Sequence, residues 1–227
     1  TSRNWAVWLP DYLEGYDPDP LRYFLSINMP ERADTDFSWE EFVRRNNDEL
    51  VATYGNLVHR VLTFTHRQFH ELVPEAPQDD RDRALLGRGQ AVMDRVDSLL
   101  GRCRFRESIM EIMALAQQAN RYLEEKSPWK AIASDRAYAA GAMRTALTII
   151  DNLKTMLHPF LPFSSQALHQ LLGYEGRLED AGWLWRELPP GQRLGEPRAL
   201  FTKLEDRVVE EEKARLGQLA SAGGKAA

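Results

Sequence analysis

Apolar residues recur at intervals of three and four from Trp39 to about Leu72, and this repeat limits the choice of folds more than any other feature of the chain. Such spacing places the apolar side chains on one face of an α-helix. At about 1.5 Å per residue, that helix would be roughly 50 Å long. No alternation of apolar and polar residues lasts long enough to form a sheet, so the chain is predicted to be all-α. The repeat consists of Phe42, Val43, Leu50, Val51, Tyr54, Leu57, Val58, Val61, Leu62 and Phe69.

Two signals refine this long helix. Ser38 and Glu41, in "SWEE", have the spacing of a capping box, in which each side chain bonds to a backbone amide near the other residue. They predict that the helix begins at Ser38. Gly55 lies inside the repeat, where glycine costs about 1 kcal/mol relative to alanine, so we expect it to mark close helix packing or a bend.

The rest of the chain alternates helical segments with turn formers. Asp17 is expected to cap a short helix that begins at Pro18, and "VPEAPQDD" reads as a linker. Ser127 and Pro128 are expected to restart the chain as N-cap and first-turn residue. The pattern predicts an antiparallel bundle with up-and-down connections. Expected helices cover about 18–28, 80–101, 106–126, 135–160, 164–173 (stopped by Gly173) and 207–220, with 174–200 as loop and 200–206 extended.

Composition and charge limit the cellular compartment and the kinds of partner to expect. A chain of 227 residues can bury a sizeable core, and its one cysteine, Cys103, cannot pair internally. No apolar run approaches the roughly 20 residues of a membrane span, and the N-terminus lacks the order of a signal peptide. These features favour a cytoplasmic protein without a membrane partner. The net charge of −5 argues against general binding to nucleic acid, but it allows recognition of a few exposed bases.

Signatures of metal binding and catalysis are missing from the sequence. The cysteine and the five scattered histidines form no ligand cluster, and His66 and His70, spaced as on a helical zinc site, have no evident third ligand. Neither a G-x-S-x-G motif nor a glycine-rich phosphate loop is present. We therefore expect no metal, no cofactor and no catalytic residue in this chain. The histidines are His59, His66, His70, His158 and His169.

Three residues could instead recognise bases. Asn56 and Arg60 are four apart, so a helix would hold both planar groups on one face with Cβ atoms roughly 5–6 Å apart. Both groups can form paired hydrogen bonds to the edges of bases. Trp129, directly after Ser127 and Pro128, could provide a stacking surface. On these residues alone, the structural interpretations are favoured: a solvated Asn–Arg pair on a helix face and a partly buried aromatic at a helix junction.

Residues 1–62, "TSRNWAVWLPDYLEGYDPDPLRYFLSINMPERADTDFSWEEFVRRNNDELVATYGNLVHRVL", resemble the region that follows the KMSKS signature of methionyl-tRNA synthetases. The resemblance resumes at "NRYLEEKSPWK" (120–130), "HPFLPFSSQ" (158–166) and "LFTKLED" (200–206). It weakens at about 74–100 and 174–200. The order and spacing of these segments make it specific.

The resemblance implies a class I synthetase anticodon-binding bundle over 38–227, with a C-terminal extension. Residues 1–37 would be the end of the KMSKS loop and a connecting segment that contacts the tRNA stem. Asn56 and Arg60 in "NLVHR" and Trp129 in "SPW" match the positions that recognise the CAU anticodon in that family. The implied partner is the methionine-specific tRNA.

The same resemblance implies that the parent protein is a methionine–tRNA ligase that uses ATP with Mg. Thr1 and Ser2 would be the fourth and fifth residues of the KMSKS loop, with threonine where the second lysine of the signature stands. The nucleotide-binding fold and the HIGH signature are missing, so the chain is expected to be a C-terminal piece without the catalytic domain, and a monomer.

Two alternatives remain open on the sequence. The chain could be the bundle of another class I synthetase, such as those for cysteine, valine, leucine or isoleucine. It could also be a helical scaffold for a protein partner, in which Asn56, Arg60 and Trp129 are ordinary surface residues.

Overall fold

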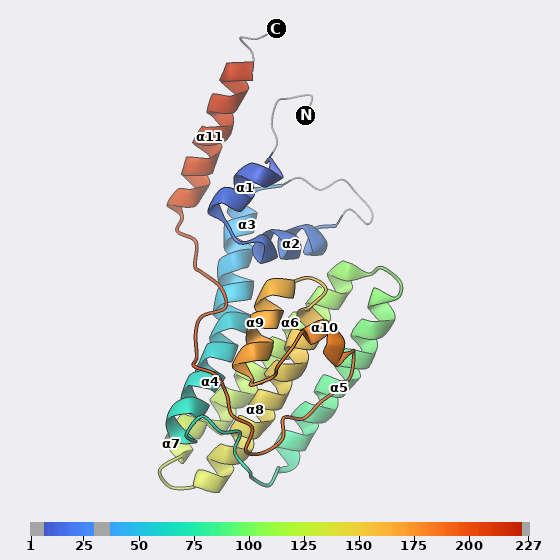
Figure 1. The fold of residues 1–227 in the computed structure, drawn as a ribbon, viewed down its shortest axis with the longest axis vertical. Helices are drawn as coiled ribbons and strands as arrows, with labels where there is room; N and C mark the ends of the chain where they lie inside the picture. The colour runs from blue at the N-terminus through green and yellow to red at the C-terminus, as the bar shows by residue number, and fades with distance from the viewer. Residues whose placement is uncertain (1–6, 30–36, 224–227) are drawn as a thin grey trace.

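The computed structural model describes residues 7–29 and 37–223, with side chains described as far as 215. Within these ranges the chain is helical, and the one backbone bridge outside the helices joins Leu72 to Arg193. The prediction of an all-α fold is confirmed (Figure 1). Thr1 and Ser2, expected at the end of the KMSKS loop, lie outside the described residues.

The longest helical element is continuous from Trp39 to Gln68. It consists of α3 (Trp39–Arg45), a π-helix η1 (Asn46–Gly55) and α4 (Asn56–Gln68). The prediction that one helix runs from the "SWEE" cap past Arg60 is confirmed. Its middle is a π-helix instead of the expected α-helix, and it ends four residues before Leu72 because His70 and Glu71 adopt left-handed φ values of 54° and 65°.

The cap of this element is only half of the predicted box. The Ser38 side chain accepts a hydrogen bond from the Glu41 amide at 3.3 Å. The Glu41 carboxylate binds Arg44 at 2.6 Å and Arg45 at 2.9 Å and does not return to the Ser38 backbone. Ser38 therefore caps the helix as expected, whereas Glu41 braces its first turns through ion pairs.

Gly55 ends the π-helix where another segment approaches closely. A Cβ atom added there would lie 2.8 Å from the Leu50 carbonyl oxygen and 3.3 Å from Cδ2 of Phe201. Since a real Cβ does not come so near a backbone oxygen, the absence of a side chain permits this packing. Packing at Gly55 is therefore close, but its partner is Phe201, which lies outside the helices, and not a second helix as expected.

Four helices form the body of the bundle. Long helices α5 (Asp80–Leu100), α6 (Phe105–Lys126) and α8 (Arg136–Leu157) pack alongside α4, and the short α7 (Pro128–Ala131) lies at the lower end, where the chain turns from α6 to α8 (Figure 1). Most side chains of α8 are buried, so it is the centre of the core. The predicted helices over these regions are confirmed to within a few residues. Large fully buried side chains include Leu57, Leu62, Ile109, Ile112, Leu115, Leu123, Met143 and Leu147.

The N-terminal segment lies at the opposite end from α7. It contains α1 (Leu9–Gly15), which the sequence did not predict, and α2 (Pro18–Ile27), which begins at Pro18 as expected. The Asp17 side chain makes no capping hydrogen bond, so only its position matches the prediction. Arg22 donates to the carbonyl of Pro159 at 3.0 Å, which fastens α2 across the end of the bundle (Figure 1).

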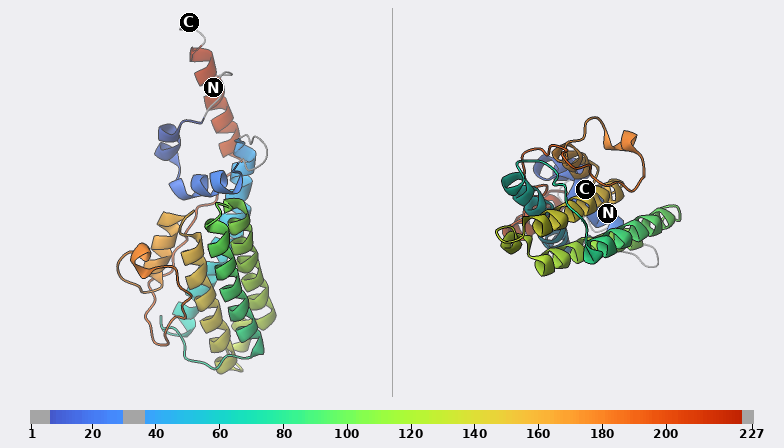
Figure 2. Two further views of the ribbon diagram at one scale, coloured as in Figure 1. Left: turned by 90° about the vertical axis from the view of Figure 1, so that its right-hand side faces the viewer. Right: turned by 90° about the horizontal axis from the view of Figure 1, so that it is seen from below.

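A second, aromatic cluster joins this segment to the long helix. Its buried members come from α1, α2 and α3, and side chains of α11 (Arg207–Gly223) pack against it. α11 leaves the bundle at this same end (Figure 2). The cluster contains residues on both sides of the expected boundary between 37 and 38, and that boundary stays a prediction. The buried residues are Tyr12, Leu21, Phe24, Trp39, Phe42 and Val43.

The C-terminal third returns along the bundle. α9 (Pro162–Leu171) is followed by Gly173 at φ +83°, the expected stop, and by α10 (Leu178–Ala181), a helix in a region predicted as loop. Residues 200–206, predicted to be extended, contain bends at 200 and 201, a turn at 206 and no regular secondary structure between them. Asn47 donates to the Leu204 carbonyl at 2.8 Å and accepts from the Leu204 amide at 2.9 Å, which holds this segment against η1.

Candidate nucleic-acid interface

Arg60 and Trp129 meet at the lower end of the bundle. The guanidinium carbon of Arg60 lies 4.7 Å from the centre of the Trp129 ring, within the range of a cation–π contact. Arg60 comes from α4 and Trp129 from α7, two helices that are far apart in the sequence. The fold therefore brings together two of the three candidate residues.

Asn56 completes the group one turn earlier on α4. It is exposed, Arg60 is half-buried, and both lie in the regular α-helical part of the long element, so they share one face. Within the described part of the chain, neither side chain makes a hydrogen bond. The amide and the guanidinium donors are thus available to a ligand.

The path of the chain before Trp129 explains why its ring is presented to solvent. Ser127 ends α6 in the left-handed conformation, with φ 43° and ψ 52°, and Pro128 begins α7. The Ser127 hydroxyl donates back to the Glu124 carbonyl at 2.7 Å and caps no amide of α7, so Ser127 is the N-cap residue as predicted, but its side chain makes no capping hydrogen bond. Trp129 follows with 37% of its surface exposed.

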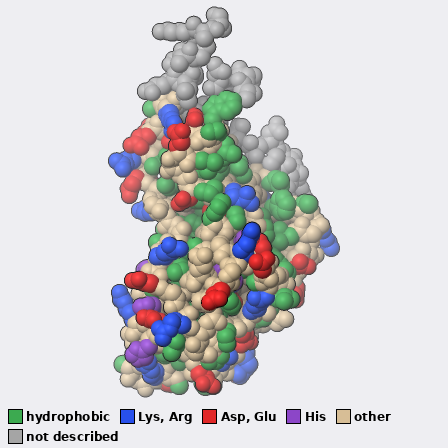
Figure 3. Space-filling model, in the orientation of Figure 1, with side chains coloured by type: hydrophobic (Ala, Val, Ile, Leu, Met, Phe, Trp, Pro, Cys, Tyr) green, Lys and Arg blue, Asp and Glu red, His purple; other side chains and the backbone are tan. Residues whose placement is uncertain are grey.

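The side chains in this arrangement could bind unstacked bases of a single-stranded nucleic acid. An exposed indole offers a stacking surface, and the neighbouring guanidinium and amide offer planar donors and an acceptor. Basic and histidine side chains gather over the lower end of α4 on the face shown in Figure 3. His66, on that helix, lies 3.4 Å from the Glu71 carboxylate.

The described residues contain neither a metal-binding cluster nor a membrane-spanning helix. Across 7–29 and 37–223, no group of three or more His, Cys, Asp or Glu side chains could hold a metal ion. In the same ranges, no helix is long and apolar enough to cross a membrane. Cys103 is a free, exposed thiol in the turn between α5 and α6.

Sequence reasoning missed a buried residue beside this site. Lys126, the last residue of α6, is 3% exposed and forms ion pairs with Asp79 and Asp82. The sequence signal was slight, since a lysine at the end of a helix is ordinary. Only the fold brings the two carboxylates to it.

Two protein-family models match the chain. Residues 1–62 match tRNA synthetases class I (M), and residues 73–221 match the anticodon binding domain of methionyl tRNA ligase. Asn56 and Arg60 fall in the first match and Trp129 in the second.

Curated relatives are methionine–tRNA ligases. The protein from Dehalococcoides mccartyi strain BAV1 is 52% identical over 217 residues, which cover 95% of this chain and 39% of the relative. That from Thermomicrobium roseum is 45% identical over 243 residues, which cover 95% of this chain and 42% of the relative. The chain thus spans about two fifths of the length of these relatives.

Solved structures similar to this chain are also methionyl-tRNA synthetases. The chain superposes on apo methionyl-tRNA synthetase from Mycobacterium tuberculosis with a TM-score of 0.82 and 25% identity, over 88% of this chain and 41% of that one. It superposes on the same enzyme in complex with methionyl-adenylate with a TM-score of 0.80 and 25% identity, over 86% of this chain and 39% of that one. Because one family model covers well over half of it, this chain belongs to the methionyl-tRNA ligase family, with residues 73–221 matching the anticodon-binding domain.

Proposed function

We propose that this chain is the tRNA-binding region of a methionine–tRNA ligase and that Asn56, Arg60 and Trp129 recognise the CAU anticodon. The observation that carries the proposal is the 4.7 Å contact between Arg60 and the Trp129 ring, with Asn56 exposed one turn away. Bases in a single-stranded loop are unstacked, so their faces and edges are accessible to such a group.

Each residue has a distinct task in this proposal. Trp129 stacks on one base, a contact worth about 1–3 kcal/mol. Arg60, which already covers part of the indole, directs its fork of donors to acceptors on a base edge. Asn56 offers an acceptor and two donors and can match the edge of cytosine or adenine.

The rest of the chain holds this group in place. In the proposed division, residues 1–37 connect to the catalytic part and contact the tRNA stem, and 38–227 form the bundle. α2 packs at one end of the bundle and α7 lies at the other (Figure 1). The continuous element from Trp39 to Gln68 links the two ends.

The parent enzyme is proposed to attach methionine to its tRNA with ATP and Mg. The methionyl-adenylate complex of the Mycobacterium enzyme supports an adenylate intermediate in this family. No residue of this chain is assigned to that chemistry. A cytoplasmic location and a monomeric state are part of the same proposal.

The test measures specificity. Arg60→Ala and Asn56→Ala should each weaken binding of a CAU stem-loop by roughly 1–3 kcal/mol and affect a loop altered at its first anticodon position much less. Both titrations are run at one salt concentration, because phosphate contacts depend on ionic strength. Arg67→Ala is the matched control, since it removes an exposed arginine from the same helix and should weaken both complexes equally.

An unchanged ratio of the two affinities in both variants would show that Asn56 and Arg60 do not recognise bases. Failure of the wild-type chain to bind either loop would favour the other interpretation, a helical scaffold for a protein partner.

A further inference from the structure

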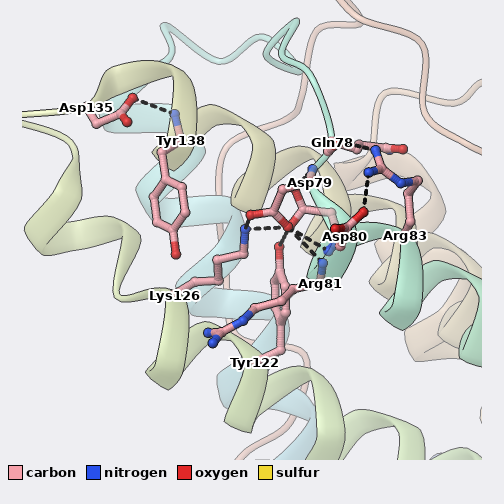
Figure 4. Close-up of polar contacts among 10 residues, drawn as sticks. Gln78, Asp79, Asp80, Arg81, Arg83, Tyr122, Lys126, Asp135 and Tyr138 are labelled. Carbon is pink, nitrogen blue, oxygen red and sulfur yellow. Dashed lines mark hydrogen bonds and ion pairs between the residues drawn. The ribbon is translucent and has the colours of Figure 1, made fainter.

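Lys126 forms a buried ion pair with Asp82 directly before the proposed anticodon site, and Asp79, whose side chain is 46% exposed, is its second partner. Its ammonium nitrogen lies 2.5 Å from a carboxylate oxygen of Asp79 and 2.7 Å from one of Asp82 (Figure 4). Tyr122 donates its hydroxyl proton to Asp82 at 2.6 Å. The ring of Tyr138 lies 4.3 Å from the same ammonium. We call Lys126, Asp79 and Asp82 the Lys126 lock.

The charge on Lys126 is well satisfied despite its burial. Burial alone would lower the pKa of this lysine, but the hydrogen bonds to Asp79 and Asp82 outweigh burial and raise it. Lys126 is therefore charged at neutral pH. Removal of one member of such a buried pair leaves a charge without a partner, which makes the geometry of the group costly to disturb.

The Lys126 lock joins α5 to α6, and the contact with Tyr138 adds α8. Asp79 caps the start of α5, with its side chain accepting hydrogen bonds from the amides of Arg81 and Asp82. Lys126 is the last residue of α6, and Tyr138 belongs to the first turn of α8 (Figure 4). The position of the α6 terminus is thus fixed by the start of α5 and by α8.

Little freedom remains between Lys126 and Trp129. Ser127 occupies the left-handed region at φ 43°, which is unusual for a residue other than glycine, and Pro128 has a restricted φ. The direction of the indole therefore follows from the placement of the α6 terminus. The contact with Arg60, on α4, further restrains the Trp129 ring.

We propose that Lys126 is a positioning residue for anticodon recognition. The Lys126 lock fixes the end of α6, so that Trp129 meets Arg60 before RNA arrives and little ordering is required on binding. Lys126 itself does not contact RNA. This inference rests on the proposed function of Trp129.

Two variants loosen the lock to different degrees. Lys126→Met keeps the length of the side chain but removes its charge. Asp79→Asn is milder, because Lys126 keeps Asp82 and asparagine is as good an N-cap as aspartate. Lys154→Met is the matched control, since Lys154 is also 3% exposed and also paired with an aspartate, Asp151, but lies elsewhere in the bundle on α8.

The first measurement does not involve RNA. The indole N–H resonance of Trp129, assigned by its loss in Trp129→Phe, should shift in Lys126→Met and in Asp79→Asn and stay in place in Lys154→Met. Circular dichroism reports whether each variant is folded, and Asp79→Asn keeps the test decisive if Lys126→Met does not fold.

The second measurement is affinity for a CAU stem-loop. We expect Lys126→Met to weaken binding by about tenfold and Asp79→Asn by about threefold, in the range of couplings between neighbouring groups. In a Trp129→Ala background both losses should largely disappear, because the lock acts through the indole. Lys154→Met should bind as the wild type does in either background.

The outcomes separate this inference from the function on which it rests. If Trp129→Ala binds RNA as tightly as the wild type, the proposed function fails and the inference fails with it. If Trp129→Ala weakens binding while both lock variants keep wild-type affinity and an unshifted indole resonance, the inference alone is wrong. Equal losses with and without the Trp129 indole would also overturn it.

Discussion

At the scale of single residues, we expect Trp129 to contribute to RNA binding and little to the stability of the fold. Trp129 belongs to neither apolar cluster and is 37% exposed. Trp129→Ala should therefore lower the unfolding free energy by much less than the about 3–5 kcal/mol of a buried aromatic deletion. It should weaken CAU stem-loop binding by about 1–3 kcal/mol. Urea unfolding and fluorescence titration check the two halves.

Trp39 provides the comparison, because it is 2% exposed in the aromatic cluster. Trp39→Ala should cost about 3–5 kcal/mol of unfolding free energy. If Trp129→Ala destabilises the chain as much as Trp39→Ala does, the Trp129 indole has a structural role and the assignment to base stacking is wrong.

The candidate residues differ in how far the sequence alone could predict their arrangement. Helical spacing alone placed Asn56 and Arg60 on one face, because both belong to a single regular helix. The meeting of Arg60 with Trp129 depends on tertiary packing between α4 and α7, which spacing does not encode. Lys126 stayed hidden for the same reason, since its partners Asp79 and Asp82 come from another helix.

At the scale of elements, the π-helix is the feature that propensity did not predict. Gly55→Ala should destabilise the chain by about 1–3 kcal/mol, because the new methyl would press on the Leu50 carbonyl and on the Phe201 ring. This loss exceeds the helix propensity that alanine gains over glycine. Chemical denaturation of the variant measures the difference.

Gly87 is the matched control for this substitution. It lies in α5 with nothing within 4 Å of an added Cβ, so Gly87→Ala should stabilise the chain by about 0.5–1 kcal/mol. An equal gain at Gly55 would mean that the π-helix tolerates a side chain there and that close packing is not the reason for the glycine.

The periodicity of apolar residues predicted the long helices well, because one face of each packs on the core. The short helices α1 and α10 escaped it, since seven and four residues are too few for a repeat to show. The π-helix escaped because its buried residues, Asn46, Leu50 and Tyr54, are four apart, a spacing that an α-helix also shows.

At the scale of the whole molecule, a buried group in the C-terminal third links global stability to pH. His169 is 2% exposed and stacks on Tyr174, with ring centres 4.7 Å apart and an angle of 7° between planes. The Tyr174 hydroxyl donates to Asp151 at 3.0 Å, and Asp151 is paired with Lys154. Protonation of His169 would therefore place a second positive charge beside buried Lys154.

Burial, followed by the charge of Lys154, lowers the pKa of His169 below its ordinary 6.5. Asp151 and Arg186 also face this group and act in opposite senses on it. Well above pH 6.5 the histidine is neutral in both the folded and the unfolded chain, so it does not reduce the unfolding free energy. As the pH falls below 6.5, the unfolded chain takes up the proton first, and unfolding becomes more favourable until the folded pKa is reached.

We therefore predict that the unfolding free energy of the chain falls between pH 6.5 and 5 and that His169→Phe reduces this fall. Phenylalanine keeps an aromatic ring against Tyr174 but carries no proton. The measurement is urea denaturation at intervals from pH 8 to 5. His59→Phe, which makes the same substitution at an exposed position, is measured in parallel as the control. If His169→Phe and the wild type lose stability in parallel over this range, another group carries the pH dependence.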